Sequence, residues 1–152
     1  MRNRPRKLRL HDYLPYRLSV ATNAVSRLIA GAYESRFALK IPQWRLMAVL
    51  ADEGALTQQA LCGRTIMDKV TVMRAAQSLL RRRLIKRVPN AQDGRSHRLV
   101  MTAAGQRLYD QIVPTALEYQ ARLLAGIDRS DIVRLEEILK RLEKSAIGLS
   151  EA

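Results

Sequence analysis

The positive charge of this chain is concentrated in one segment, residues 55–101. That segment carries ten Lys or Arg and two acids, so it supplies +8 of the formal net charge of +13. The first ten residues add +5, while the remaining two segments are close to neutral. A locally positive surface favours a polyanionic partner, because binding releases condensed counterions. A charged run can equally be a solvated helix face. The pattern of apolar residues inside the run distinguishes this alternative from a binding surface.

That pattern predicts two short helices. Thr57 is placed to cap a helix over residues 58–64, and Asp68 to cap another over residues 69–83, because such side chains accept hydrogen bonds from the first N–H groups of a helix. A tight connection between two short helices is typical of a helix-turn-helix. The segment therefore favours duplex DNA as its partner.

The second of these helices has one apolar face and one free face. Advancing 100° per residue places Val72, Ala76, Leu79 and Leu80 together as the buried face. The opposite face holds Val70, Arg74, Gln77 and Arg81, with Thr71 beside it. Arginine can pair with guanine, glutamine with adenine, and an aliphatic methyl can touch the thymine methyl. A solvated face would explain the polar residues but not an exposed Val70.

Individual roles follow from position on this helix. Arg74 is the strongest candidate for a base contact, and Arg81 is expected to meet backbone phosphate. Lys69 lies at the helix N-terminus, where the helix dipole also attracts phosphate.

A β-hairpin is expected after the two helices. Strand-like runs at residues 84–88 and 96–101 enclose a turn rich in Pro, Asn, Asp and Gly.

Longer helices flank this central region. Apolar residues at helical spacing predict a helix over residues 13–37, and another begins at Ile41. Thr102 caps a long helix with a kink expected at Pro114, and Asp128 begins the last helix. The apolar stripes of the first helix and the two last ones exceed what a small domain can cover, which favours a dimer interface. An intramolecular helical bundle is the alternative.

Five strings of residues, in this order and spacing, resemble the MarR family of bacterial winged-helix regulators. They are Gln43-Trp44-Arg45, Leu56-Thr57-Gln58-Gln59, Asp68-Lys69-Val70-Thr71-Val72, Asp93-Gly94-Arg95 and Leu99-Val100-Met101-Thr102-Ala103-Ala104-Gly105. The resemblance implies a mainly α fold with a small β-wing, in which a winged helix-turn-helix domain is joined to a helical dimerisation base. It implies one domain over residues 1–152, with a DNA-binding region at 41–102 and a dimerisation region at 1–37 and 103–152. The expected function is a homodimeric repressor on a pseudo-palindromic operator in double-stranded DNA.

The resemblance also assigns the hairpin. As the wing, it would place Arg95 in the minor groove with Asp93 holding the guanidinium, and His97 and Arg98 near phosphates. A turn with a local ion pair is the alternative reading of Asp93 and Arg95. The chain departs from the family pattern at Val70 and Met73, where small hydroxyl residues are frequent, and at 65–67, where a glycine-containing turn is common. Those departures concern base preference rather than fold.

Family members commonly release DNA when a small aromatic acid binds. The corresponding residues here are His11, Tyr16, Ser26, Trp44, Arg45, Met47 and Tyr109. Arg45 is the expected anchor for a carboxylate, because a guanidinium at an apolar helical junction requires an anionic partner. The alternative is that Trp44 and Met47 belong to the core and Arg45 pairs with Glu34 or Asp52.

Other classes of protein are disfavoured. The sequence has no phosphate loop, nucleophile elbow or His/Cys cluster, so neither an enzyme, a cofactor nor a metal site is expected. Cys62 reads as a small packed side chain rather than a redox sensor. With one cysteine and no long apolar run, the expected location is the cytoplasm. The rival function is a basic nucleic-acid-binding or architectural protein without effector control.

Overall fold

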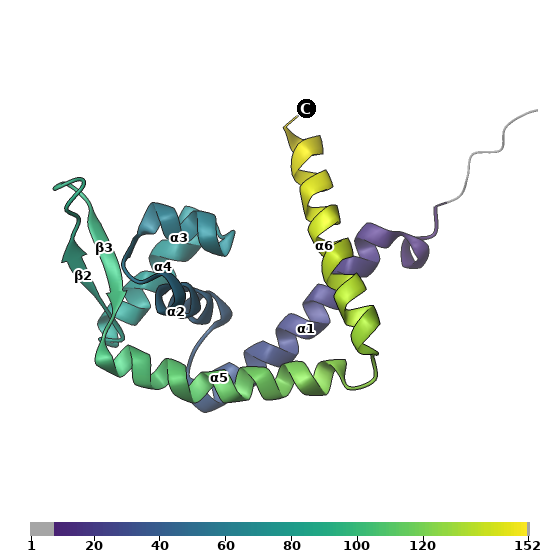
Figure 1. Ribbon diagram of the computed structural model, residues 1–152, viewed down its shortest axis with the longest axis horizontal. Coiled ribbons are helices and arrows are strands. Elements are labelled where there is room, and N and C mark those ends of the chain that lie inside the picture. The colour runs from purple at the N-terminus through teal and green to yellow at the C-terminus, as the bar shows by residue number, and fades with distance from the viewer. Residues whose placement is uncertain (1–7, 152) are drawn as a thin grey trace, which may run out of the picture. The chain divides into compact units, whose positions relative to one another are not determined.

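The computed structural model describes residues 8–151; most of the basic residues among the first ten fall outside this range. Within it the chain forms six α-helices, one short 3₁₀-helix (Leu10–Asp12) and one three-stranded sheet (Figure 1). The elements are α1 (Leu14–Phe37), α2 (Ile41–Glu53), β1 (Leu56–Thr57), α3 (Gln58–Thr65), α4 (Lys69–Arg81), β2 (Ile85–Pro89), β3 (His97–Met101), α5 (Ala103–Leu124) and α6 (Arg129–Ser150). The predicted fold class, mainly α with a small β-wing, is confirmed.

Side chains begin three of these helices as predicted. Thr57 Oγ1 accepts from the Ala60 N–H at 3.1 Å, Asp68 Oδ1 from the Thr71 N–H at 2.8 Å, and Thr102 Oγ1 from the Gly105 N–H at 3.0 Å. Asp128 differs, because it stands at the N-cap of α6 without a side-chain hydrogen bond there.

The sheet is antiparallel, with the order β1-β3-β2. The hairpin pairs Lys86 with Val100 and Val88 with Arg98. β1 was not predicted, because two residues are too short to show an alternating pattern. It pairs with β3 on the other side, where Leu56 faces Leu99, and so fixes the start of α3 against the wing.

Two compact units divide the chain, and the boundary lies inside α5 between Val113 and Pro114. The first unit contains the core, whose side chains come from the last part of α1, from α2, α3 and α4, from the sheet and from the first half of α5. Its fully buried members include Leu46, Met47, Leu61, Val72, Leu79, Ile85, Leu99 and Ile112.

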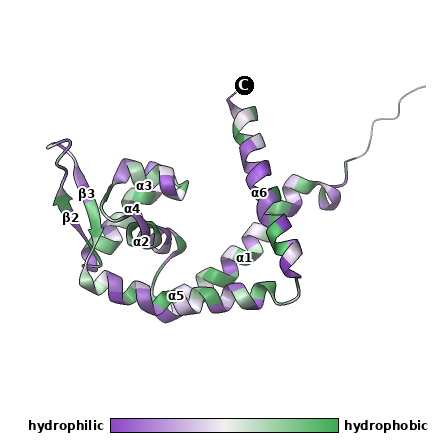
Figure 2. Ribbon diagram, viewed as in Figure 1, coloured by the Kyte–Doolittle hydropathy of each residue, from purple (hydrophilic) through white to green (hydrophobic). Residues whose placement is uncertain are grey.

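The second unit contains α6, which has no buried residue. Hydrophobic and hydrophilic residues are interspersed along this helix (Figure 2).

Candidate nucleic-acid interface

Helix α4 divides into a buried and an exposed face. Val72, Ala75, Ala76 and Leu79 are buried against the rest of the first unit. Lys69, Val70, Arg74, Gln77 and Arg81 are exposed, and Val70 retains 49% of its accessible surface. The phasing therefore predicted the orientation of this helix correctly.

Thr71 is engaged within the protein. Its N–H and its hydroxyl both donate to the Asp68 carboxylate, at 2.8 Å and 2.7 Å. Because the hydroxyl proton is used in this bond, Thr71 can contact a DNA groove mainly through its methyl group. The cap fixes the first turn of α4 and with it the position of Lys69.

The same cap makes α4 sensitive to acid. Hydrogen bonds from the Thr71 hydroxyl and then from the Thr71 backbone N–H hold the pKa of Asp68 below its usual value. A carboxyl whose pKa is lower in the folded than in the unfolded state stabilises fully above its unfolded pKa, and this stabilisation is lost as the pH falls through the folded pKa. We expect the urea midpoint of the wild type to fall across this acidic range by more than that of Asp68→Asn, which keeps an acceptor that does not titrate. Equal falls in the two proteins would contradict this assignment.

A hollow of about 490 Å³ lies along α4 and the start of α2. Its lining includes Lys40, Gln43, Arg74 and Arg81. Gln43 is buried: its Oε1 accepts from the Lys40 N–H at 2.8 Å, while its Nε2 donates to Ser78 Oγ on α4 at 2.7 Å. One side chain therefore begins α2 and also holds α4.

Sequence reasoning missed both Lys40 and this role of Gln43. The available signal was a glutamine three residues after the N-cap position of a helix with proline in its first turn.

The wing tip has a different contact from the one expected. Asp93 Oδ1 accepts from the backbone N–H of Arg95 at 3.0 Å, whereas the ion pairs of the described residues do not include one between Asp93 and the Arg95 guanidinium. The aspartate therefore shapes the turn and leaves the guanidinium exposed. The buried Asn90 closes the turn by donating to Ser96 Oγ at 2.7 Å.

His97 and Arg98 do not share a surface. Successive side chains of a strand point to opposite faces of the sheet, so these two neighbours on β3 diverge. His97 is exposed and lines a hollow of about 480 Å³ together with Gln58, Arg87 and Arg95. Arg98 is half-buried, and its Nε is enclosed without a hydrogen-bond partner among residues 8–151. Arg98 is thus a weaker phosphate candidate than His97.

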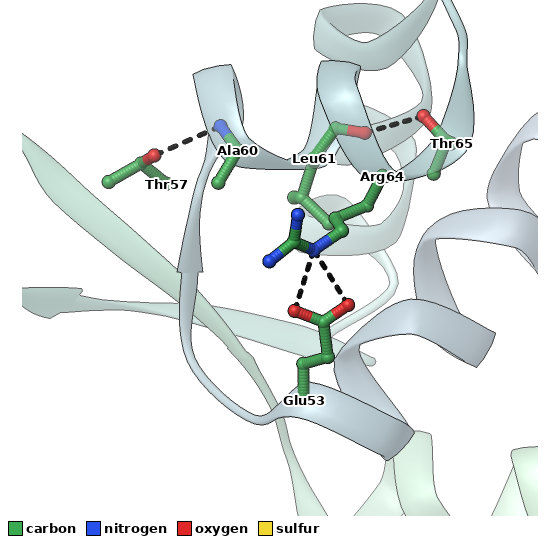
Figure 3. Close-up of polar contacts among 6 residues, drawn as sticks. All are labelled: Glu53, Thr57, Ala60, Leu61, Arg64 and Thr65. Carbon is green, nitrogen blue, oxygen red and sulfur yellow. Dashed lines mark hydrogen bonds and ion pairs between the residues drawn. The ribbon is translucent and has the colours of Figure 1, made fainter.

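Two arginines of the basic segment have partners inside the fold. Arg64 Nε donates to both carboxylate oxygens of Glu53 at 2.8 Å, which joins the ends of α2 and α3 and raises the pKa of Arg64 (Figure 3). Arg82 donates to the carbonyls of Ala38 and Phe37 at 2.8 Å and 3.1 Å, so it caps the end of α1.

Among the residues expected to bind an effector, Trp44 and Tyr109 are in direct contact. Trp44 stacks on Tyr109 with the ring centroids 5.4 Å apart, and Tyr33 meets the same indole edge-on. Burial raises the pKa of Tyr33. Met47 is fully buried, as the core alternative expected.

Arg45 differs from both readings. It is exposed rather than set in an apolar junction, and the ion pairs within residues 8–151 do not include one to Glu34 or Asp52. His11 and Tyr16 are exposed near the start of α1. Ser26 lies apart, in a hollow of about 440 Å³ that it lines with Val20, Asn23, Arg27, Ala30 and Ile41.

The described residues hold neither a cluster of metal-ligating side chains nor a helix long and apolar enough to cross a membrane. Cys62 is half-buried on α3.

Comparison with known proteins shows which family the central part of this chain resembles. Residues 39–96, from just before α2 to the wing tip, match the MarR family. The repressor NicR of Pseudomonas putida is 23% identical over 141 residues, covering 86% of this chain and 87% of NicR.

Solved structures extend the match beyond that region. A MarR/EmrR family regulator from Acinetobacter sp. ADP1 superposes with a TM-score of 0.85 at 21% identity, covering 93% of this chain and 99% of that one. A probable transcriptional regulator from Pseudomonas aeruginosa gives a TM-score of 0.82 at 27% identity, covering 88% and 99%. BpsR of Bordetella bronchiseptica, whose DNA binding is regulated by 6-hydroxynicotinic acid, gives 0.71 at 18% identity, covering 84% and 98%. With its capped α4, its wing and these matches, the chain resembles the MarR family over residues 39–96 and shares the fold of these solved transcriptional regulators along most of its length.

Proposed function

We propose that the protein is a homodimeric repressor that reads a pseudo-palindromic operator through α4 and the wing. The observation that carries this proposal is the exposed face of α4, where Val70, Arg74, Gln77 and Arg81 lie opposite a fully packed face. A helix presenting guanidinium, amide and methyl groups has the inventory for reading base edges in a major groove. The exposed guanidinium of Arg95 suits a narrow minor groove, where negative potential is concentrated.

Selection of bound fragments from genomic DNA with the purified protein tests this proposal. A specific regulator should hold its selected fragment at least about 10³-fold more tightly than random DNA at the same salt concentration. The rival architectural role predicts similar affinity and a similar salt slope on every sequence. Equal binding to the recovered and random fragments would therefore overturn the repressor proposal.

Helix α6 supports the dimer. Leu135, Ile138, Leu139 and Leu142 share one face of it, and each keeps between 37% and 45% of its surface exposed. A second copy of the chain would cover this face, as the symmetric dimers common among soluble proteins do.

Sedimentation equilibrium of wild type, Leu139→Glu and Val133→Glu tests this assembly. Val133 is on the opposite face of α6 and is 49% exposed. We expect Leu139→Glu to lower the average mass toward that of one chain, because it places a charge in the interface, while Val133→Glu remains dimeric. A wild-type protein that sediments as one chain would contradict the dimer.

A small aromatic acid is the proposed effector. The named ligand of BpsR has this chemistry. The hollow beside α1 has a size suited to such a ligand and combines apolar side chains with the polar Asn23, Ser26 and the cation Arg27. Arg27 is therefore a candidate carboxylate anchor in addition to Arg45.

We expect aryl carboxylates to weaken operator binding in a titration. Arg27→Ala should raise the half-effective concentration about tenfold, because the variant cannot make a charge-assisted hydrogen bond to the carboxylate. Arg36→Ala is the matched control, since it removes the same charge from another exposed position of α1 that does not line the hollow. Arg45→Ala tests the second candidate anchor. A response abolished in Arg45→Ala alone would instead assign the anchor to Arg45. Operator affinity unchanged by every acid tested would contradict effector control.

A further inference from the structure

Three large apolar side chains are exposed at the beginning of α4. Ile66 in the preceding turn is 80% exposed, Val70 in the first turn 49%, and Met73 in the second 38%. They are interspersed with Lys69 and Arg74, which are also exposed. We call Ile66, Val70 and Met73 the apolar patch.

Ile66 is in a conformation that its side chain disfavours. Its φ is +53°, in the left-handed region, where a β-branched residue is an outlier. With four fifths of its surface exposed, it gains little packing in return. Strained residues of this kind are concentrated at functional sites, which favours a role for Ile66 in binding a partner outside the folded chain.

Val70 and Met73 extend the same feature onto the helix. Residues three apart are neighbours on a helix surface, so these two side chains form a continuous apolar area. They lie in the N-terminal half of α4, and recognition helices contact base edges through their N-terminal residues. The cations beside them match the charge of the phosphates that border a groove.

The apolar feature of a DNA major groove is the thymine C5-methyl group. We propose that the apolar patch reads thymine methyls in each operator half-site. This inference rests on the proposed operator binding and adds which base feature is recognised. Arg74 and Gln77 would then select purines at neighbouring positions, while the patch selects thymine over cytosine.

Replacement of single thymines by deoxyuridine tests this inference, because it removes the methyl and keeps the base-pairing edge. Starting from the selected operator, we expect about fourfold weaker binding at each contacted thymine, since one buried methyl contributes about 0.8 kcal/mol. Deoxyuridine at thymines outside the protected region is the control.

Val70→Thr assigns the effect to the patch, because threonine has the same shape with a hydroxyl in place of one methyl. We expect Val70→Thr to weaken binding to the thymine operator and to show a smaller further loss with deoxyuridine than wild type does. Val133→Thr is the matched control: this valine has the same exposed fraction, 49%, and lies on α6. It should leave both affinities unchanged.

Ile66→Gly separates strain from recognition. Glycine adopts a positive φ without steric cost, so we expect the thermal midpoint to rise. Affinity for the thymine operator should fall about fourfold for each thymine methyl that Ile66 covers in the wild-type complex. If Ile66→Gly raises the thermal midpoint and leaves the affinity for the thymine operator unchanged, Ile66 does not contribute to thymine recognition.

The outcomes distinguish this inference from the function on which it rests. If the protein selects an operator that tolerates deoxyuridine throughout, or one without thymine in its half-sites, the methyl-reading inference is wrong and the repressor proposal stands. If no fragment binds better than random DNA, both are wrong. A position-specific deoxyuridine effect that disappears in Val70→Thr supports both.

Discussion

Gly105→Ala is expected to lower the free energy of unfolding by about 2–4 kcal/mol, because overpacking at a rigid site forces the backbone to move. A Cβ at this buried position of α5 would overlap the Leu84 carbonyl oxygen and lie 2.9 Å from the carbonyl carbon. That carbonyl cannot easily retreat, since it accepts hydrogen bonds from the Thr102 N–H at 3.0 Å and the Thr102 hydroxyl at 3.1 Å. The glycine thus permits the start of α5 to lie directly against the base of the wing.

Gly63→Ala is the control for this substitution. Gly63 is also helical, but nothing lies within 4 Å of the Cβ position, so alanine should stabilise by about 0.5–1 kcal/mol through its helix propensity. Urea unfolding followed by circular dichroism measures both variants. Equal changes in the free energy of unfolding of the two variants would show that Gly105 does not lie tightly against the Leu84 carbonyl in solution.

Arg74→Ala is expected to reduce the preference for operator over random DNA by about 5- to 150-fold for each half-site, the effect of losing 1–3 kcal/mol of base discrimination. Arg74 is exposed on the free face of α4 and has no acidic partner among the ion pairs within residues 8–151. Its guanidinium is therefore available for a base edge. Competition binding at one salt concentration measures the ratio.

Lys69→Ala and Arg107→Ala are the controls. Lys69 begins α4, where it should meet phosphate, so its removal should weaken operator and random DNA alike and reduce the salt slope by about one. Arg107 is an exposed arginine on α5, and its replacement removes one charge from another helix. If Arg74→Ala weakens binding to the operator and to random DNA by the same factor, Arg74 does not take part in base recognition.

Local features of this fold were predictable from the sequence. The caps at Thr57, Asp68 and Thr102 depend on residues three positions away, and the outward face of α4 depends only on helical periodicity. Both kinds of signal lie within a short stretch of the sequence. The hairpin was recognisable from its turn residues. Its first strand is shifted by one residue at both ends, and its second strand begins one residue later than predicted.

Long-range features could not be predicted in the same way. The Gln43 bond to Ser78 spans 35 residues, and Arg82 reaches carbonyls 44 and 45 residues away. The hydrogen bond from the Arg95 backbone N–H to Asp93 depends on the conformation of the turn, which the resemblance did not specify. Arg45 is exposed because of the orientation of α2, which its neighbours in sequence do not reveal.

The ion pair between Arg64 and Glu53 bears on how the protein first meets DNA. At distances beyond a Debye length of about 8 Å, a partner senses the summed field rather than individual side chains. Glu53 compensates the charge of Arg64 at the end of α3, so this pair adds no net charge there. The ion pairs of the described residues do not include the exposed cations of α4 and of the wing, so no acidic partner compensates their charge there. If α4 and the wing bind the operator as proposed, we expect this field to orient an approaching duplex toward them before contact and so to shorten the search for a productive orientation.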